Sequence, residues 1–248
     1  MRFSKSLIIL ALSASLAACG DSDNNEVEVT DPVMPVMSYE FTVQVTNLTN
    51  AQPLSPIAAI AHSEGMLWQI GEPASAALEL MAEGGDNSEL LATDFAMASS
   101  SAESPLPPGE QVTLKLSTEQ LDSLKISLAT MLVNTNDAFT GLNAIDVSSL
   151  AVNESMSRTS FAYDAGTEAN DELVVEGSGM PGTPGIPAAP GGNAGMNGSG
   201  VTSSETNMMV HIHPGNLGDD DLEAGMSDLD NTVHRWLNPV AMLKVTVK

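Results

Sequence analysis

Apolar and polar residues alternate where the folded part of the chain begins. Phe41, Val43 and Val45 are separated by single polar residues, which is the period of a strand with one buried face, and residues 47–50 form a polar turn. Residues 112–116 repeat the alternation. Short apolar runs predict further strands at residues 53–62, 124–133, 145–150, 161–163, 209–213 and 240–247. The run 124–133 is strongly apolar, so we expect it at the centre of a sheet.

Two helices and two loops complete the pattern. Glu72-Pro73 opens one helix, which continues through 74–82 to Gly84-Gly85, and residues 86–92 predict a second, short helix. Residues 99–108 predict a loop, as does the Gly/Pro-rich run from Met180 to Gly200. Many short strands, few helices and no strand–helix–strand alternation predict an all-β fold with short helices. We expect one domain, residues 39–248, built as an antiparallel β-sandwich.

The first residues resemble an export signal. Arg2 and Lys5 precede an apolar stretch, residues 7–18, whose 12 residues fall short of the roughly 20 that span a membrane. Residues 16–19 (LAAC) resemble the lipobox of bacterial lipoproteins, which implies a signal peptide over 1–18 and acylation of Cys19. Residues 19–38 would then be a lipidated, flexible tether. An ordinary signal peptide whose cleavage site happens to contain a cysteine is the alternative.

Cys19 is the only cysteine, so the chain has no intramolecular disulfide and no thiol-based zinc or nucleophilic site. Acylation would hold the protein on a membrane through its N-terminus. The glycine at position 20 favours the outer membrane, so we expect an outer membrane lipoprotein of the cell envelope that faces the periplasm or the cell surface.

The chain is strongly acidic. Its formal net charge is −24, and loss of residues 1–18 would leave 6 basic and 32 acidic residues, a net charge of −26. Nucleic-acid binding needs a basic surface, so this class of partner is excluded. Acidic surfaces attract cations, although most surface carboxylates serve only solubility.

Carboxylates gather in two loops that follow apolar runs. Asp137 follows the run 124–133, and four more acidic residues lie within nine positions, at Asp164, Glu168, Asp171 and Glu172. Loop oxygens at one end of a sandwich suit calcium, which takes 6–8 oxygen ligands without strict geometry. Gly166 would let the second loop turn tightly. The alternative is a solvated acidic loop.

Both loops resemble motifs of the spondin domain, which F-spondin and mindin carry in animal matrix and adhesion proteins. Residues 131–142 (MLVNTNDAFTGL) are similar to that domain's S-P-D-W-F-V-G element, and residues 162–168 (AYDAGTE) to its P-W-D-A-G-T-D element. Further agreement lies in GEPA (71–74), AEGGD (82–86), the Pro-Gly loop, VHIHPG (210–215) and NPVA (238–241). The resemblance covers residues 39–248 in order and is typical of bacterial spondin-domain proteins.

The resemblance implies a spondin-type antiparallel β-sandwich with a calcium site at one end. The family's metal-binding positions fall on Asp137, Asp164 and Glu168. Glu168 is one methylene longer than the family's Asp, and Ala138 replaces its Trp. Asp171 and Glu172 are possible further ligands to which the resemblance assigns no role.

His211 and His213 are two residues apart on a predicted strand, so both would face one side. With His234 or residues 219–221 they could form a transition-metal site, and with nearby carboxylates a metal-assisted hydrolase. The alternative is a pair of rim histidines beside a turn. No nucleophile elbow and no phosphate-binding loop occurs in the sequence. We therefore expect a calcium-binding adhesion or structural module, not an enzyme, with a protein or polysaccharide matrix ligand.

Overall fold

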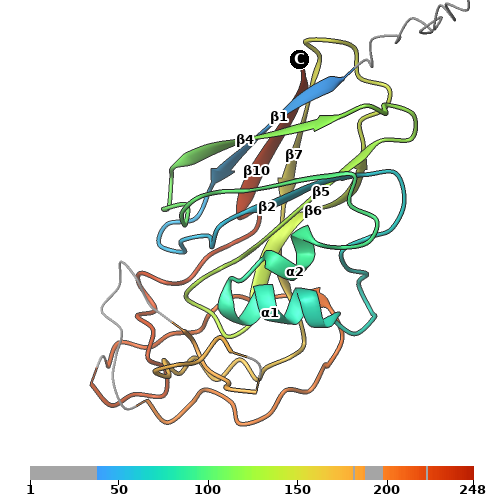
Figure 1. The fold of residues 1–248 in the computed structure, drawn as a ribbon. Coiled ribbons are helices and arrows are strands. Elements are labelled where there is room, and N and C mark those ends of the chain that lie inside the picture. The colour runs from blue at the N-terminus through green and yellow to red at the C-terminus, as the bar shows by residue number, and fades with distance from the viewer. Residues whose placement is uncertain (1–37, 181, 188–197, 222) are drawn as a thin grey trace, which may run out of the picture. The chain divides into compact units, whose positions relative to one another are not determined.

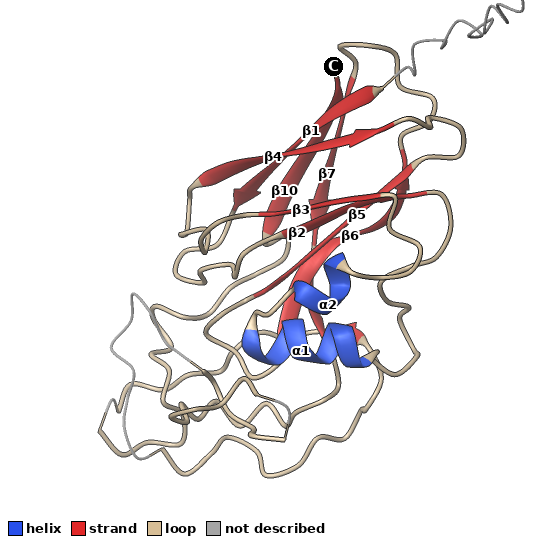
Figure 2. Ribbon diagram, in the orientation of Figure 1, coloured by secondary structure: helices blue, strands red, loops and turns tan. Residues whose placement is uncertain are grey.

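The structure is a computed structural model that describes residues 38–180, 182–187, 198–221 and 223–248 (Figures 1 and 2). The predicted signal peptide, Cys19 and all of the tether except residue 38 lie outside the described residues and stay predictions. The described residues pack as one compact unit.

Two antiparallel sheets face each other, which confirms the all-β sandwich. The four-stranded sheet has the order β4 (Gln111–Thr118), β1 (Tyr39–Asn47), β10 (Ala241–Val247) and β7 (Ser155–Ser160). The six-stranded sheet has the order β3 (Ala98–Ser101), β2 (Ala58–His62), β5 (Lys125–Met131), β6 (Ala138–Asp146), β8 (Ala162–Asp164) and β9 (His211–Ile212). The C-terminal strand β10 pairs with β1, so both ends of the folded chain lie in one sheet.

The core between the sheets follows from the alternation along β1. Phe41, Val43 and Val45 point inward and are 0–1% exposed, whereas the residues between them are only partly buried. They pack with apolar side chains of the opposite sheet, among them Ile126 and Leu128 of β5. Burial of this apolar surface is the main source of stability for the sandwich.

Helix α1 (Ala76–Gly84) covers the other face of the six-stranded sheet, followed by α2 (Ser88–Leu91) (Figure 2). Ser75 caps α1, because its hydroxyl oxygen accepts a hydrogen bond from the Leu78 amide at 3.2 Å. Gly85 ends α1 in the left-handed conformation, with φ of 72°. Because α1 packs on β5, both faces of that strand are buried, which explains why its sequence is strongly apolar without a regular alternation.

The sequence predicted no strand at β3 or β7 and only the last two residues of β6. The expected strand at 145–150 is wrong, because β6 ends at Asp146, and the expected loop at 99–108 begins with the last residues of β3. Strand β7 was not predicted. Polar residues fill β3 (ASSS) and β7 (SMSRTS), and neither strand has the apolar alternation that identified β1.

Long loops gather at one end of the sandwich, beside α1 (Figure 1). We call the described residues between 165 and 237 the loop layer. Within that described part, β9 is the only named strand, and the other β contacts are isolated bridges such as Val174 with Ile186. The predicted acidic residues lie where this layer meets the ends of β6 and β8.

Candidate metal centre

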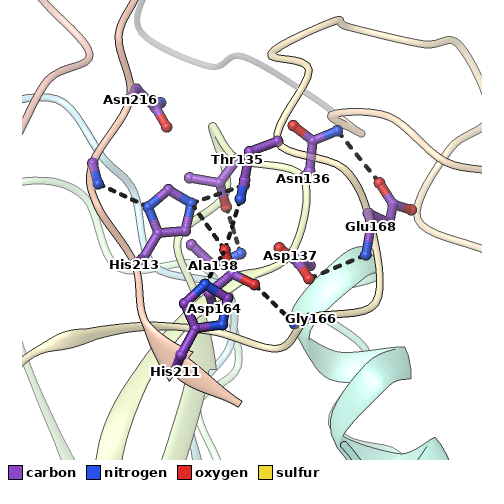
Figure 3. A network of polar contacts seen from close by, with 12 residues as sticks. Thr135, Asn136, Asp137, Ala138, Asp164, Gly166, Glu168, His211, His213 and Asn216 are labelled. Carbon is purple, nitrogen blue, oxygen red and sulfur yellow. Dashed lines mark hydrogen bonds and ion pairs between the residues drawn. The ribbon is translucent and has the colours of Figure 1, made fainter. Parts of the chain in front are cut away.

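Adjacent strands bring Asp137 and Asp164 together. Asp137 immediately precedes β6, and Asp164 is the last residue of β8, where it lies opposite Ala138. The Ala165 amide donates to the Asp137 carbonyl oxygen at 3.3 Å. Both Asp side chains belong to residues with 0% exposure, and their carboxylates lie side by side in Figure 3. Two of the three predicted metal ligands therefore lie next to each other in the protein interior.

Asp137 uses only one of its two carboxylate oxygens in hydrogen bonds. Its Oδ2 accepts from the Thr167 amide at 2.8 Å, the Thr167 hydroxyl at 3.2 Å and the Glu168 amide at 3.2 Å. Its Oδ1 is buried and has no hydrogen-bond partner. Burial, and next the neighbouring charge of Asp164, raise the pKa of Asp137 to about 7.

Asp164 organises the turn that follows β8. Its Oδ1 accepts from the Gly166 amide at 2.8 Å, and its Oδ2 accepts from the Asn170 side-chain amide at 2.7 Å. Burial is the main cause that raises the pKa of Asp164. Gly166 has φ of +71°, and a Cβ there would lie 2.8 Å from backbone atoms of 207–209, so this turn requires glycine.

Glu168 points its carboxylate away from this pair (Figure 3). Glu168 Oε2 accepts from the Gly185 amide at 2.8 Å and from the Asn136 side-chain amide at 3.4 Å. Burial raises the pKa of Glu168 to about 7. The third predicted ligand therefore contacts the Asp pair only through its backbone amide, which donates to Asp137.

Asp171 and Glu172, the two possible further ligands, accept hydrogen bonds away from the Asp pair. Asp171 accepts from the Asn136 side chain at 2.9 Å and from the Leu173 amide at 3.0 Å. Glu172 accepts from the amides of Leu217 and Gly218 at 2.5 and 2.8 Å. Asp171 therefore joins the loop layer to the segment before β6, and Glu172 ties two parts of the loop layer together.

The two predicted histidines differ in their surroundings. His213 is buried and both its ring nitrogens are engaged: Nδ1 accepts from the Gly215 amide at 3.0 Å, and Nε2 pairs with Asn170 Oδ1 at 2.9 Å. Burial, and next the charge of His211, lower the pKa of His213 to about 3, so its ring is neutral. His211 Nδ1 lies 2.8 Å from the Met209 carbonyl oxygen, and its Nε2 lies 3.7 Å from Asp164 Oδ2.

Asn170 links the predicted residues, although the sequence did not single it out. It donates to Asp164 and accepts from His213. An amide can do both, because it carries a donor and an acceptor. The only available signal was its place inside the acidic loop, between Glu168 and Asp171.

The other predicted metal-site residues are held separately. His234 is buried, and its Nδ1 accepts from the Asp230 amide at 3.0 Å. Asp219 accepts from the backbone amides of Met226, Ser227 and Asp221 at 2.6–3.0 Å.

The fit of this centre to a cation rests on Asp137 and Asp164. Across the described ranges, no group of three or more His, Cys, Asp or Glu side chains is already placed to hold a metal ion. The Asp pair nevertheless has the chemistry that a cation needs: two buried carboxylates, of which Asp137 is disfavoured in its charged form by burial and by Asp164, and one buried oxygen that lacks a partner.

Comparison with known proteins adds no relative. No family model matches the chain, and no curated protein sequence matches it. In the part of the chain that the structure describes, no helix has the length and apolar character needed to cross a membrane.

Proposed function

We propose that this protein is a lipid-anchored binding module of a bacterial cell envelope, in which Asp137 and Asp164 hold a calcium ion. The observation that carries the proposal is the buried, unpartnered Oδ1 of Asp137 beside the buried carboxylate of Asp164. The resemblance of both loops to the spondin domain supports the same ion at the same positions.

Calcium would remove the energetic cost of this arrangement. A buried carboxylate without a counter-charge is disfavoured by desolvation, and two such groups repel each other. Calcium accepts carboxylate, carbonyl and water oxygens in a flexible shell. Asp137 and Asp164 would bind it, whereas Glu168 would become a ligand only after giving up its hydrogen bond from Gly185.

The ion would stiffen the loops that begin at this centre. Asp137 holds the backbone of residues 167–168 and Asp164 holds that of Gly166, so the first turn of the acidic loop depends on both carboxylates. Loops on a rigid sandwich are where binding residues concentrate. A protein or polysaccharide of the envelope or matrix is the class of ligand that we propose.

The hydrolase alternative has less support. A catalytic zinc site needs three protein ligands and one open position. His213, one of its two proposed histidines, uses both ring nitrogens in hydrogen bonds within the loop layer.

Thermal unfolding of Asp137→Asn, with calcium and with chelator, tests the calcium site. In the variant, Oδ1 becomes an amide that can donate to Asp164 while the remaining oxygen still serves Thr167 and Glu168. We expect the chelated variant to melt above the chelated wild type, and calcium to stabilise only the wild type. Saturation at about 100 times the Kd corresponds to roughly 2.7 kcal/mol.

Asp146→Asn is the matched control. Asp146 is exposed at the end of β6, and its Oδ1 accepts from Ser148, which an asparagine oxygen can also do. This variant loses the same charge and should keep the full calcium response. Equal melting of the wild type with calcium and with chelator would contradict the proposal.

The anchor is tested separately by metabolic labelling with a fatty acid. We expect label on the wild type and none on Cys19→Ser, whose product should leave the membrane fraction. Label on both proteins, or on neither, would show that Cys19 is not the acylated residue.

A further inference from the structure

His211 presents a free ring nitrogen to the buried carboxylate of Asp164. Its Nδ1 lies 2.8 Å from the Met209 carbonyl oxygen, which can only accept, so Nδ1 carries the hydrogen. In the neutral ring, Nε2 then has a lone pair, and it lies 3.7 Å from Asp164 Oδ2. Two acceptors therefore face each other at a distance too long for a hydrogen bond.

His213 shows by contrast what a histidine with a purely structural role looks like here. Its Nε2 is 3.9 Å from the same Asp164 oxygen, but Asn170 and Gly215 occupy both of its nitrogens. Its side chain is 1% exposed, against 26% for the His211 side chain. Only His211 combines a free nitrogen with access from solvent.

We propose that His211 Nε2, Asp164 and Asp137 Oδ1 form a mixed nitrogen and oxygen site for a divalent transition-metal ion of the Zn²⁺ or Mn²⁺ class. This inference rests on the cation position of the proposed function and adds a nitrogen ligand to it. The ion competes with calcium for the two carboxylates.

The hydrogen bond to Met209 is the arrangement that metal-binding histidines use. Such a histidine commonly donates its second N–H to a carbonyl or carboxylate, which fixes the ring and aims the other nitrogen at the metal. Metal bonds to His nitrogen and Asp oxygen are about 2.0–2.2 Å long, so two ligands of one ion lie roughly 3.0–3.6 Å apart. The observed 3.7 Å needs only a small approach of the two side chains.

The donor set decides the kind of ion. Imidazole suits zinc and its neighbours in the transition series, and carboxylates suit calcium and manganese. Calcium takes oxygen ligands and gains little from a nitrogen. Loss of His211 should therefore weaken Zn²⁺ binding strongly, by roughly 100-fold, while leaving calcium binding within about threefold of the wild type.

Pulsed electron paramagnetic resonance with Mn²⁺ as the probe, on the purified full chain, tests the nitrogen ligand directly. We expect coupling to an imidazole ¹⁴N in the wild type and none in His211→Gln, and calorimetry should show the loss of Zn²⁺ affinity in that variant. Glu205→Gln is the control: its charge raises the pKa of Asp164, but its carboxylate accepts from the amides of Thr206 and Asn207. This control should keep the nitrogen coupling.

The outcomes separate the two proposals. Calcium binding without nitrogen coupling, and with Zn²⁺ no tighter than calcium, overturns the His211 site and leaves the proposed function standing. Zn²⁺ binding that survives Asp164→Asn also overturns it, because the ion then lies elsewhere. Absence of binding by all three ions removes both proposals.

Discussion

The sandwich and the loop layer are stabilised by different side chains. Between the sheets, residues such as Phe41 and Leu128 are fully buried among other apolar groups. In the loop layer, buried carboxylates accept backbone N–H groups that no strand ladder satisfies. Asp228, for example, accepts from the amides of Val174 and Gly198 at 2.8 and 3.0 Å. Some of the acidic side chains therefore accept hydrogen bonds from backbone N–H groups, as strand carbonyl groups do in the sheets.

This difference bears on the metal centre, which lies at the boundary of the two regions. Buried amides must find acceptors, and a carboxylate provides several at once. Asp137 and Glu172 use their oxygens in this way, yet only Asp137 keeps one buried carboxylate oxygen free. A carboxylate can thus fix loop backbone with one oxygen and keep the other oxygen available for a cation.

Truncation inside the sandwich should have the largest effect. Phe41→Ala removes a side chain with 0% exposure and leaves a cavity, so the free energy of unfolding should fall by about 3–5 kcal/mol. Urea denaturation measures this change, and Thr42→Ala on the outer face of β1 should change stability by less than about 0.5 kcal/mol. Similar losses in both variants would mean that the β1 alternation does not define the core.

The sequence predicted this region well because its signal is local. Alternation identified β1 and β4, an apolar run identified β10, and a strongly apolar run identified β5 as central. Polar strands such as β3 and β7 lack that signal, since their place depends on the partners beside them.

The loop layer was less predictable because its contacts are non-local. Asp137 and Asp164 were singled out correctly as neighbours, whereas the sequence could not show that the Glu168 carboxylate turns to Gly185, 17 residues away. Side-chain direction depends on which backbone amides lack partners, and this is known only after the loops are packed.

The pH dependence of stability should isolate Asp137. Its pKa is about 7 in the folded chain, against 3.8 for an unperturbed aspartate, so the folded state binds more protons between these values. The free energy of unfolding therefore falls as pH rises from about 4 to about 7. Relative to the wild type, chelated Asp137→Asn should gain stability through this window, reaching about 2–4 kcal/mol above pH 7.

The prediction concerns the difference in the free energy of unfolding between variant and wild type, because buried histidines change stability with pH in the opposite direction. His213 has a pKa of about 3 in the folded chain against 6.5, so it adds stability as pH rises through that range, in wild type and variant alike. Chemical denaturation at several pH values measures the difference. A gain independent of pH would show that Asp137 is already ionised at pH 4.

Loss of one loop-layer carboxylate should act locally. Glu172→Ala leaves the amides of Leu217 and Gly218 and the Ser227 hydroxyl without their acceptor, at a cost of about 1–3 kcal/mol. Hydrogen exchange should become faster at 217–218 while the β1 amides stay protected. Glu172→Gln keeps one acceptor oxygen, so its stability should lie between those of the wild type and Glu172→Ala. Uniformly faster exchange would mean that the sandwich and the loop layer unfold as one unit.

The smallest effect is expected for Glu168→Gln, and it decides how Glu168 contributes to the metal centre. The glutamine oxygen can still accept from Gly185, so if the carboxylate keeps this bond when calcium enters, affinity should change by less than about threefold, or 0.7 kcal/mol. If the carboxylate instead turns to the ion, as the spondin resemblance implies, affinity should fall by tenfold or more. Calcium calorimetry on Glu168→Gln beside Asp146→Asn separates the two. A tenfold loss would place Glu168 with Asp137 and Asp164 as a ligand, and would mean that cation binding releases the segment around Gly185 from the loop layer.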